Sequence, residues 1–450
     1  MDLSGKKVLV AGAGKTGIST ARFLLQKGAQ LTVADTNIHA EIPEDIKQST
    51  AKTIRGPHEN SIFTEQDLII ISPGIPLTIE PIAKAISNGI KVISEIELAS
   101  LFTKTPIIAI TGTNGKTTTT TLLQHIFETC GKKVFTGGNI GTPLIEYASG
   151  VQDADYIIAE ISSFQLEAIY KFRPCISILL NITEDHLDRY DLFDDYVSAK
   201  NNIFKNQQKA DTAIINREDD IAVTLAENIN ADVYFFSTQK EIKNGAFFKD
   251  GFRFTKENDE TFIAEKGIHL TGEHNRENIL AAVSAANICG LPIKKITKAL
   301  QTFKGLPHRM EFVDSLKGID FYDDSKATNV GACLKSITSI KPPIILIAGG
   351  KDKGGSYLPL KNKISENVQE LILIGQAQNR IKEELASTVP MSSADTLEEA
   401  VTLAFSRAKK GCSILLSPAC SSFDMFDSYV HRGNIFKTAV KALRETVYEQ

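Results

Sequence analysis

The chain has 450 residues, of which 42% are hydrophobic and 23% are charged, and its formal net charge is −4. This balance gives no sign of a nucleic-acid partner, and no apolar run approaches the roughly 18 residues that a membrane span needs. Six cysteines are scattered without a C-x-x-C pair, which indicates reduced thiols in a cytoplasmic protein rather than a disulfide framework or a zinc site. At about 150 residues per domain, the length predicts about three domains.

The N-terminal segment has the pattern of a βαβ unit around a glycine-rich turn. A strand predicted at 7–11 leads into the G-x-G-x-x-G sequence at 12–17 and a helix, and a second strand at 31–35 ends in an acid. Taken alone, this pattern predicts a dinucleotide site, because such a turn and the following helix N-terminus accept a pyrophosphate. Further strands are predicted at 68–71 and 90–93.

The most informative motif is GTNGKTT at 112–118. It follows an apolar run at 106–110 that predicts a buried strand, and it precedes a helix predicted at 119–130. Glycines in such a loop let backbone N–H groups converge on phosphate oxygens, the lysine reaches the β- and γ-phosphates, and a threonine hydroxyl can ligate Mg²⁺. The general phosphate-loop pattern has glycine where this chain has Ile110. A shorter, family-specific variant is therefore favoured over a glycine-rich turn with an incidental Lys-Thr pair.

Polar residues follow the next two predicted strands, at 156–159 and 176–180. The sequence EISS begins at Glu160, and NITEDH ends at His186. Ligands bind beyond the carboxyl ends of strands in open parallel sheets, so catalytic groups are expected in both clusters. The stretch 232–268 is predicted to form hairpins, and a helix is predicted at 279–288.

The last segment alternates strand and helix patterns and predicts another parallel α/β sheet. Its strands are expected at 312–313, 320–322, 344–347, 371–374 and 413–416. Short joints near 98 and 305 divide the chain into predicted domains at 1–98, 99–305 and 306–450. The expected fold class is therefore α/β with three domains.

Several further motifs join the phosphate loop in a fixed order: EISSFQLE at 160–167, NITEDHLDRY at 181–190, GEHNRENILAA at 272–282, LPHRME at 306–311, DDSKATN at 323–329 and SPACSSFDMF at 417–426. In this order they resemble the Mur ligase family, the ATP-dependent amino-acid ligases of peptidoglycan precursor synthesis. Three of these segments, SSFQLE, DSKATN and SPACSSFD, are similar to its D-glutamate-adding branch. The resemblance covers the whole chain. It implies a Rossmann-like N-terminal domain, a central P-loop ATPase-like domain and a Rossmann-like C-terminal domain.

The resemblance also implies a reaction. The γ-phosphoryl group of ATP is transferred to the alanyl carboxylate of UDP-N-acetylmuramoyl-L-alanine, and the amine of D-glutamate attacks the acyl phosphate, releasing ADP and phosphate. The implied partners are these two substrates, with no nucleic acid and no membrane span, and the protein is expected to be a cytoplasmic monomer.

The implied ATP-binding and metal-binding residues come from the central and C-terminal motifs. The nucleotide set is Gly112, Thr113, Asn114, Gly115, Lys116, Thr117, Thr118, Asn275, Asn278, Arg309 and Asp324. The set for two Mg²⁺ ions is Thr117, Glu160, His186 and Lys200, and the catalytic set is Lys116, His186 and Lys200. Lys200 matches a lysine that the family carbamylates. The open alternatives are a helix-capping acid at Glu160, a helix-terminal histidine at His186, a surface lysine at Lys200 and a helix N-cap at Asn275.

Two further sets concern the substrates. The UDP-substrate set is Gly14, Lys15, Thr16, Asp35, Thr36, Gly74, Asn139 and Ser162. Asn37 stands where some relatives have arginine, which leaves the uridine contacts there open. The D-glutamate set is Lys326, Thr328, Lys353, Ser422, Phe423 and Tyr429, chosen because two carboxylates need cationic and hydroxyl donors. Lys351 is the alternative to Lys353, and a core position is the alternative for the two aromatic residues.

Three other functions compete with this interpretation. Folylpolyglutamate synthase shares the phosphate-loop and HNxxN segments, but the first domain and SPACSSFD disfavour it. An NAD-dependent oxidoreductase would leave the loop at 112–118 unexplained. A regulatory P-loop NTPase would leave the C-terminal segment without a role.

Overall fold

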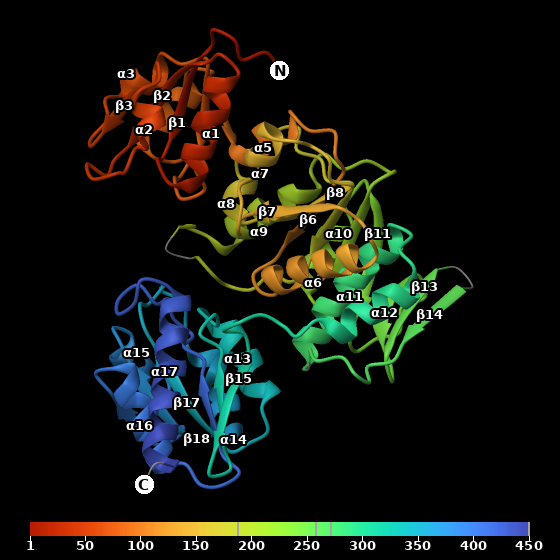
Figure 1. Cartoon of the computed structure of the whole chain (residues 1–450), viewed down its shortest axis with the longest axis vertical. Coiled ribbons are helices and arrows are strands. Elements are labelled where there is room, and N and C mark those ends of the chain that lie inside the picture. The colour runs from red at the N-terminus through yellow and green to blue at the C-terminus, as the bar shows by residue number, and fades with distance from the viewer. Residues whose placement is uncertain (187–188, 257–258, 271, 449–450) are drawn as a thin grey trace. The chain divides into compact units, whose positions relative to one another are not determined.

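A computed structural model describes residues 1–186, 189–256, 259–270 and 272–448 (Figure 1). The chain forms two compact units. The first holds Met1–Ile182, Asp194–Ile268 and Arg276–Phe303, and the second holds Thr183–Phe193, His269–Asn275 and Lys304–Gln450. Within the described residues, the first unit contains two sheets and the second contains one. No described helix has the length and apolarity that crossing a membrane requires.

The first sheet has the strand order β3-β2-β1-β4-β5 and is parallel throughout its described strands. Its strands are β1 (Lys7–Ala11), β2 (Gln30–Asp35), β3 (Lys52–Arg55), β4 (Leu68–Ile71) and β5 (Lys91–Ser94), and its helices are α1 (Lys15–Gln26), α2 (Glu44–Lys47), α3 (Asn60–Thr64) and α4 (Glu80–Ser87). This order is the Rossmann-like arrangement that the βαβ pattern predicted. Gly17 shows why the motif needs glycine, because a Cβ atom there would overlap the carbonyl oxygen of Gly12.

The second sheet has the order β14-β13-β12-β11-β10-β9-β6-β8-β7 in the described part of the chain. Its strands are β6 (Ile107–Thr111), β7 (Val134–Gly138), β8 (Tyr156–Glu160), β9 (Ile176–Leu179), β10 (Thr212–Asn216), β11 (Asp232–Ser237), β12 (Gly245–Phe248), β13 (Phe252–Lys256) and β14 (Asp259–Ile263). The fully buried β6 pairs in parallel with β8 and β9, so the carboxyl ends of these three strands meet at one edge.

The helices of the central sheet are α5 (Glu95–Ser100), α6 (Lys116–Thr129), α7 (Leu144–Ser149), α8 (Ser163–Leu166), α9 (Phe193–Asn201), α10 (Asp220–Ala226), α11 (Glu273–Ile288) and α12 (Ile293–Thr302). The hairpin prediction for 232–268 is correct for β12 to β14, which pair antiparallel. It is wrong for β11, which pairs in parallel with β10 and β12. The helix α10 supplies the crossover that a parallel neighbour requires.

The third sheet has the order β15-β16-β20-β17-β18-β19 among the described residues. Its strands are β15 (Glu311–Leu316), β16 (Ile319–Asp323), β17 (Ile344–Gly349), β18 (Val368–Ile374), β19 (Met391–Ser393) and β20 (Ser413–Leu416), and its helices are α13 (Val330–Ser339), α14 (Lys361–Asn367), α15 (Gln378–Glu384), α16 (Leu397–Arg407) and α17 (Tyr429–Tyr448). Only β15 runs antiparallel to its described neighbour. Alternate residues of β17 enter two different apolar clusters, so helices cover both faces of this sheet.

Two buried acids of α5 connect the N-terminal and central parts of the first unit. Glu97 is 0% exposed, and its carboxylate accepts backbone N–H bonds from Tyr170, Lys171 and Phe172 at 2.7–3.0 Å. Glu95 accepts one bond, from the Ile145 N–H at 2.6 Å, whereas its Oε2 atom is buried without a described hydrogen-bond partner. Burial raises the pKa of Glu95 from 4.5 to about 7.

The raised pKa of Glu95 predicts a stability that falls as the pH rises. The native state holds this proton more tightly than the unfolded chain, so the stabilisation is complete below pH 4.5 and is lost as the pH passes about 7. We expect Glu95→Gln to remove up to about 3 kcal/mol of this pH dependence. Urea unfolding of both proteins at about pH 5 and pH 8 measures the difference. Equal pH slopes for the two proteins would contradict the prediction.

Candidate functional site

The loop between β6 and α6 has the backbone of a phosphate-binding loop. Gly112 and Gly115 both have positive φ, at 150° and 87°, and Gly115 precedes the first residue of α6. A Cβ atom at Gly115 would overlap the Oδ1 atom of Asn278, so glycine is required there for space as well as for conformation. The Nζ atom of Lys116 donates to the carbonyl oxygens of Gly112 at 2.7 Å and Thr113 at 2.9 Å. The lysine therefore lies against the loop that it is predicted to serve.

Side chains from three other segments support this loop. The Oδ1 atom of Asn181 accepts the N–H of Asn114 at 2.8 Å, and its Nδ2 atom donates to the carbonyl of the same residue at 3.1 Å. The hydroxyls of Tyr196 and Thr113 are 3.0 Å apart. Asn278 accepts a hydrogen bond from Thr119 at 3.2 Å. The sequence analysis placed Asn181 in a polar cluster after a strand but gave it no individual role, and it missed Tyr196.

Glu160 is the last residue of β8 and is 2% exposed. Its Oε1 atom accepts a hydrogen bond from Asn139 at 2.8 Å, whereas its Oε2 atom is buried without a described hydrogen-bond partner. The Thr111 hydroxyl, at the end of the adjacent strand β6, is also buried without one. Hard oxygen donors without partners suit Mg²⁺, so these residues fit a magnesium ion. The alternative role of Glu160 as a helix cap is wrong, since Ser162 caps α8.

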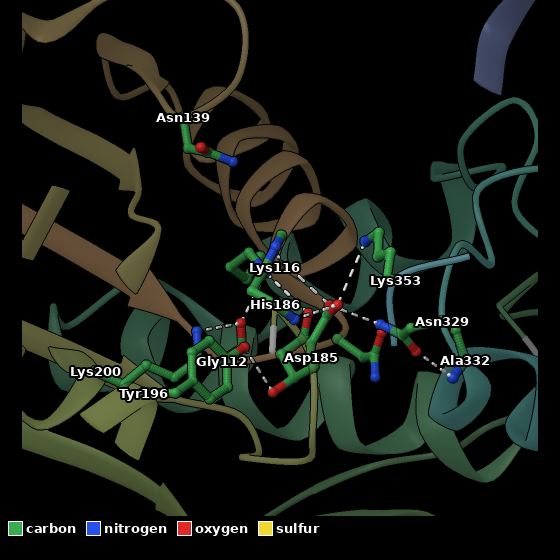
Figure 2. A network of polar contacts seen from close by, with 12 residues as sticks. Gly112, Lys116, Asn139, Asp185, His186, Tyr196, Lys200, Asn329, Ala332 and Lys353 are labelled. Atoms are coloured by element: carbon green, nitrogen blue, oxygen red, sulfur yellow. Dashed lines mark hydrogen bonds and ion pairs between the residues drawn. The ribbon is translucent and has the colours of Figure 1, made fainter. Parts of the chain in front are cut away.

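Lys200 is 1% exposed and lies on α9, so the alternative of a surface lysine is wrong. Its Nζ atom donates to the carbonyl oxygen of Gly112 at 3.0 Å and lies 4.5 Å from the centre of the Tyr196 ring. Figure 2 shows both lysine side chains directed at this carbonyl, Lys116 from the loop and Lys200 from α9. Two ammonium groups therefore converge on one backbone oxygen.

His186 belongs to the second unit, within the segment Thr183–Phe193. Its φ of 56° is unusual for a residue other than glycine. The neighbouring Asp185 accepts hydrogen bonds from Asn329 at 3.0 Å and from Lys353 at 3.3 Å, both in the same unit (Figure 2). The loop that carries His186 is thus attached to the C-terminal sheet. Leu187 and Asp188 lie outside the described residues.

Two predicted nucleotide contacts, Asn275 and Arg309, line one cavity of about 790 Å³ in the second unit. The N-cap alternative for Asn275 is wrong because α11 begins at Glu273. Asp324 is buried, accepts hydrogen bonds from the Met310 N–H at 3.2 Å and from the Ser336 hydroxyl, and has a pKa raised by burial to about 7. Asp324 therefore fixes the turn that carries Arg309.

Five of the six predicted D-glutamate residues lie on the loops after β16, β17 and β20, at one edge of the third sheet, and Tyr429 is the first residue of α17. The Lys326 ammonium lies 4.1 Å from the centre of the Tyr429 ring. Ser422 is buried, whereas Phe423 is 69% exposed, so a core position for Phe423 is wrong. Lys351 is exposed and Lys353 is partly buried beside Asp185, which favours Lys353. Thr328 lies in the same loop as Lys326, and its role stays a prediction.

The predicted UDP-substrate residues have local structural partners in the first unit. Asp35 accepts the N–H groups of Ala13 and Asn37, each at 2.8 Å, and so holds the glycine-rich turn to the end of β2. Lys15 donates to the carbonyl of Gly141 at 2.7 Å. Ser162 forms a capping box with Gln165. Gly14 directly precedes α1, and Thr16 is the second residue of that helix. Thr36 and Gly74 are exposed. Their contacts with a substrate stay predictions.

Family models match all three parts of the chain. The Mur ligase MurD-like N-terminal domain matches residues 6–94, the Mur ligase middle domain matches 110–286, and the Mur ligase glutamate ligase domain matches 308–420. The chain belongs to the Mur ligase family. The N-terminal glycine motif is accordingly part of a Mur ligase domain and is no evidence for a dehydrogenase.

Individual Mur ligases resemble this chain over nearly its full length. The UDP-N-acetylmuramoylalanine--D-glutamate ligase of Geotalea daltonii is 46% identical, with 98% of this chain and 99% of the relative covered. The ligase of the same name from Koribacter versatilis is 45% identical, with 99% of each covered. Among solved structures, a pseudomurein peptide ligase type C from Methanothermus fervidus has a TM-score of 0.63 at 21% identity, covering 98% of this chain and 100% of that one. A UDP-N-acetylmuramate-alanine ligase from Thermotoga maritima has a TM-score of 0.57 at 17% identity, covering 97% and 99%.

The unpaired oxygen of Glu160 leads to a prediction for this Mur ligase. We expect Glu160→Gln to weaken binding of ADP in the presence of Mg²⁺ by at least about tenfold, because an amide replaces a charged oxygen ligand. Binding in EDTA should change little, since the loop amides and Lys116 remain. Isothermal titration with and without Mg²⁺ separates the two contributions. An equal loss under both conditions would show that Glu160 acts on the loop and not through a metal ion.

Proposed function

We propose that this chain joins D-glutamate to UDP-N-acetylmuramoyl-L-alanine in a reaction that converts ATP to ADP and phosphate. The observation that carries the proposal is the 46% identity, over 98% of the chain, to a ligase named for these two groups. The loop of Lys116, with the buried Glu160 and Lys200 beside it, supports an ATP-dependent reaction. The proposed reaction is a cytoplasmic step of peptidoglycan synthesis.

The phosphate loop would bind and orient ATP. Phosphoryl transfer needs mainly positioning and neutralisation of charge, and the amides of 112–118 with Lys116 supply both. Lys116 must exchange its bonds to the carbonyls of Gly112 and Thr113 for phosphate oxygens when ATP binds. A bound Mg²⁺ would neutralise charge on the β- and γ-phosphates, and Thr117 and Glu160 would hold it.

The second unit would deliver the amine. Lys326, Lys353 and Ser422 offer donors for the two carboxylates of D-glutamate, while its uncharged α-amine attacks the acyl phosphate. A tetrahedral intermediate forms and then expels phosphate, leaving the amide bond. Arg309, which is predicted to contact the nucleotide, also belongs to this unit.

Lys200 is proposed to carry a carbamate and to face a second Mg²⁺. Two ammonium groups that share the carbonyl of Gly112 repel each other, and Lys200 is buried. A neutral amine is the form that reacts with CO₂, and the resulting carbamate is an anion that attracts both Lys116 and a cation. His186 is the proposed partner for the second ion.

The reaction is tested by the release of ADP. We expect release that requires both UDP-N-acetylmuramoyl-L-alanine and D-glutamate, because the acyl phosphate needs a carboxylate to form and an amine to consume it. The assay supplies a panel of D- and L-amino acids in place of D-glutamate. Turnover with L-glutamate or L-lysine but not with D-glutamate would refute the proposed substrate.

The carbamate is tested by chemical rescue. We expect Lys200→Ala to lower the rate of ADP release at least about a hundredfold, since an anion beside the metal site is lost, and acetate to restore part of it. Lys205→Ala, at an exposed lysine in the following turn, is the matched control and should keep the wild-type rate. Full activity of Lys200→Ala without acetate would rule out the carbamate.

A further inference from the structure

Arg432 lies in the first turn of α17 and is 0% exposed. By residue volume it heads the fully buried side chains of the described structure. Burying a guanidinium is unfavourable unless its hydrogen bonds are satisfied. Burial lowers the pKa of Arg432 to about 10, so the group still carries its charge at neutral pH.

Every N–H group of this guanidinium has a protein acceptor. The Nε atom donates to the Ser325 hydroxyl at 3.0 Å, and Nη2 donates to the carbonyls of Ser325 at 2.8 Å and Cys420 at 3.2 Å. Nη1 donates to the carbonyls of Cys420 at 3.3 Å and Ser421 at 3.4 Å. An arginine side chain has five donors, so none remains for a ligand. Among the described residues, no carboxylate accepts a hydrogen bond from it. The charged guanidinium is therefore bound by backbone carbonyls and one hydroxyl.

These acceptors belong to the loops that carry the predicted D-glutamate residues. Ser325 precedes Lys326 in the loop after β16, and Ser421 precedes Ser422 in the loop after β20. The Ser325 hydroxyl, which accepts from Arg432, also donates to the carbonyl of Tyr429 at 2.8 Å. One guanidinium therefore joins two loops to the start of α17.

The loop after β17 packs against the same group. A Cβ atom at Gly350 would lie 3.2 Å from the Nη1 atom of Arg432 and would overlap the carbonyl oxygen of Ser421. The glycine thus allows this loop, which continues to Lys353, to approach the guanidinium. Arg432 contacts or adjoins all three loops that hold the predicted amino-acid residues.

We propose that Arg432 is the positioning residue of the D-glutamate site, which fixes the loops after β16 and β20 at the spacing that the two carboxylates of the substrate require. The inference rests on the proposed function. Arg432 acts through the loops and does not touch the substrate. Lysine would replace it poorly, because a compact ammonium has three donors and cannot make the five hydrogen bonds of the guanidinium.

The test compares Arg432→Ala with Arg444→Ala in the full chain. Arg444 lies on the same helix, is exposed and pairs with Asp314. Arg444→Ala therefore removes the same type of side chain from α17 but leaves the contacts between Arg432 and the loops in place. We expect Arg432→Ala to raise KM for D-glutamate at least about tenfold, because misplaced binding groups lose affinity, with KM for ATP changed less than about twofold. Guanidinium ion at about 20 mM should restore part of the loss, and Arg444→Ala should match the wild type.

Two further measurements keep the proposal open to refutation. Ser325→Ala removes the hydroxyl that accepts from Arg432 and donates to the Tyr429 carbonyl, and leaves the other four bonds of the guanidinium in place. We expect a rise of about two- to fivefold in KM for D-glutamate, which tests the role of Arg432 if Arg432→Ala does not fold. Hydrogen exchange of peptides spanning 324–329 and 417–423 should accelerate in Arg432→Ala and not in Arg444→Ala. Hydrogen exchange needs no enzyme activity. It therefore tests whether Arg432 holds the two loops even if the wild type shows no turnover with D-glutamate and the proposed function fails. An active Arg432→Ala with wild-type KM values and unchanged exchange would overturn the inference.

Discussion

The convergence of Lys116 and Lys200 on the carbonyl oxygen of Gly112 is the interaction on which the central site depends. The carbonyl is available because Gly112 has a φ of 150°, and the loop keeps that conformation because Asn181 and Tyr196 hold its next two residues. Two like charges at one neutral oxygen repel each other, and an anion such as phosphate bound beside them would reduce this repulsion. The resting arrangement is therefore already suited to an anion.

Much of the fold could be predicted from the sequence because buried parallel strands are short, apolar and followed by glycine or polar residues. The strands β1, β4, β6 and β20 have this apolar pattern, and each is followed by a glycine or a polar residue. The edge strand β3 was missed because Lys52 and Arg55 at its ends give it no apolar run. The parallel pairing of β11 was missed because pairing direction depends on the connection to β10 and not on composition.

Some residues of the candidate site could likewise be predicted from the sequence, and others could not. Lys116, Glu160 and Lys200 lie within recognisable motifs, and the structure brings the two lysines together through the Gly112 carbonyl. Arg432 could not be assigned from sequence, since its acceptors are carbonyls of residues about 12 and 107 positions away, and every residue type has a carbonyl. Asp185 was likewise hidden, because its bonds to Asn329 and Lys353 join segments that are distant in the chain.

The grouping of Thr183–Phe193 with the C-terminal sheet has a consequence for exchanging parts between ligases. A chimera joined near residue 305 would take its C-terminal sheet from one parent and Asp185 from the other. Its Lys353 and Asn329 equivalents would then face a foreign loop, and the mismatch would fall beside His186. The second compact unit is therefore discontinuous in sequence, and recombination at a single crossover point cannot transplant it intact.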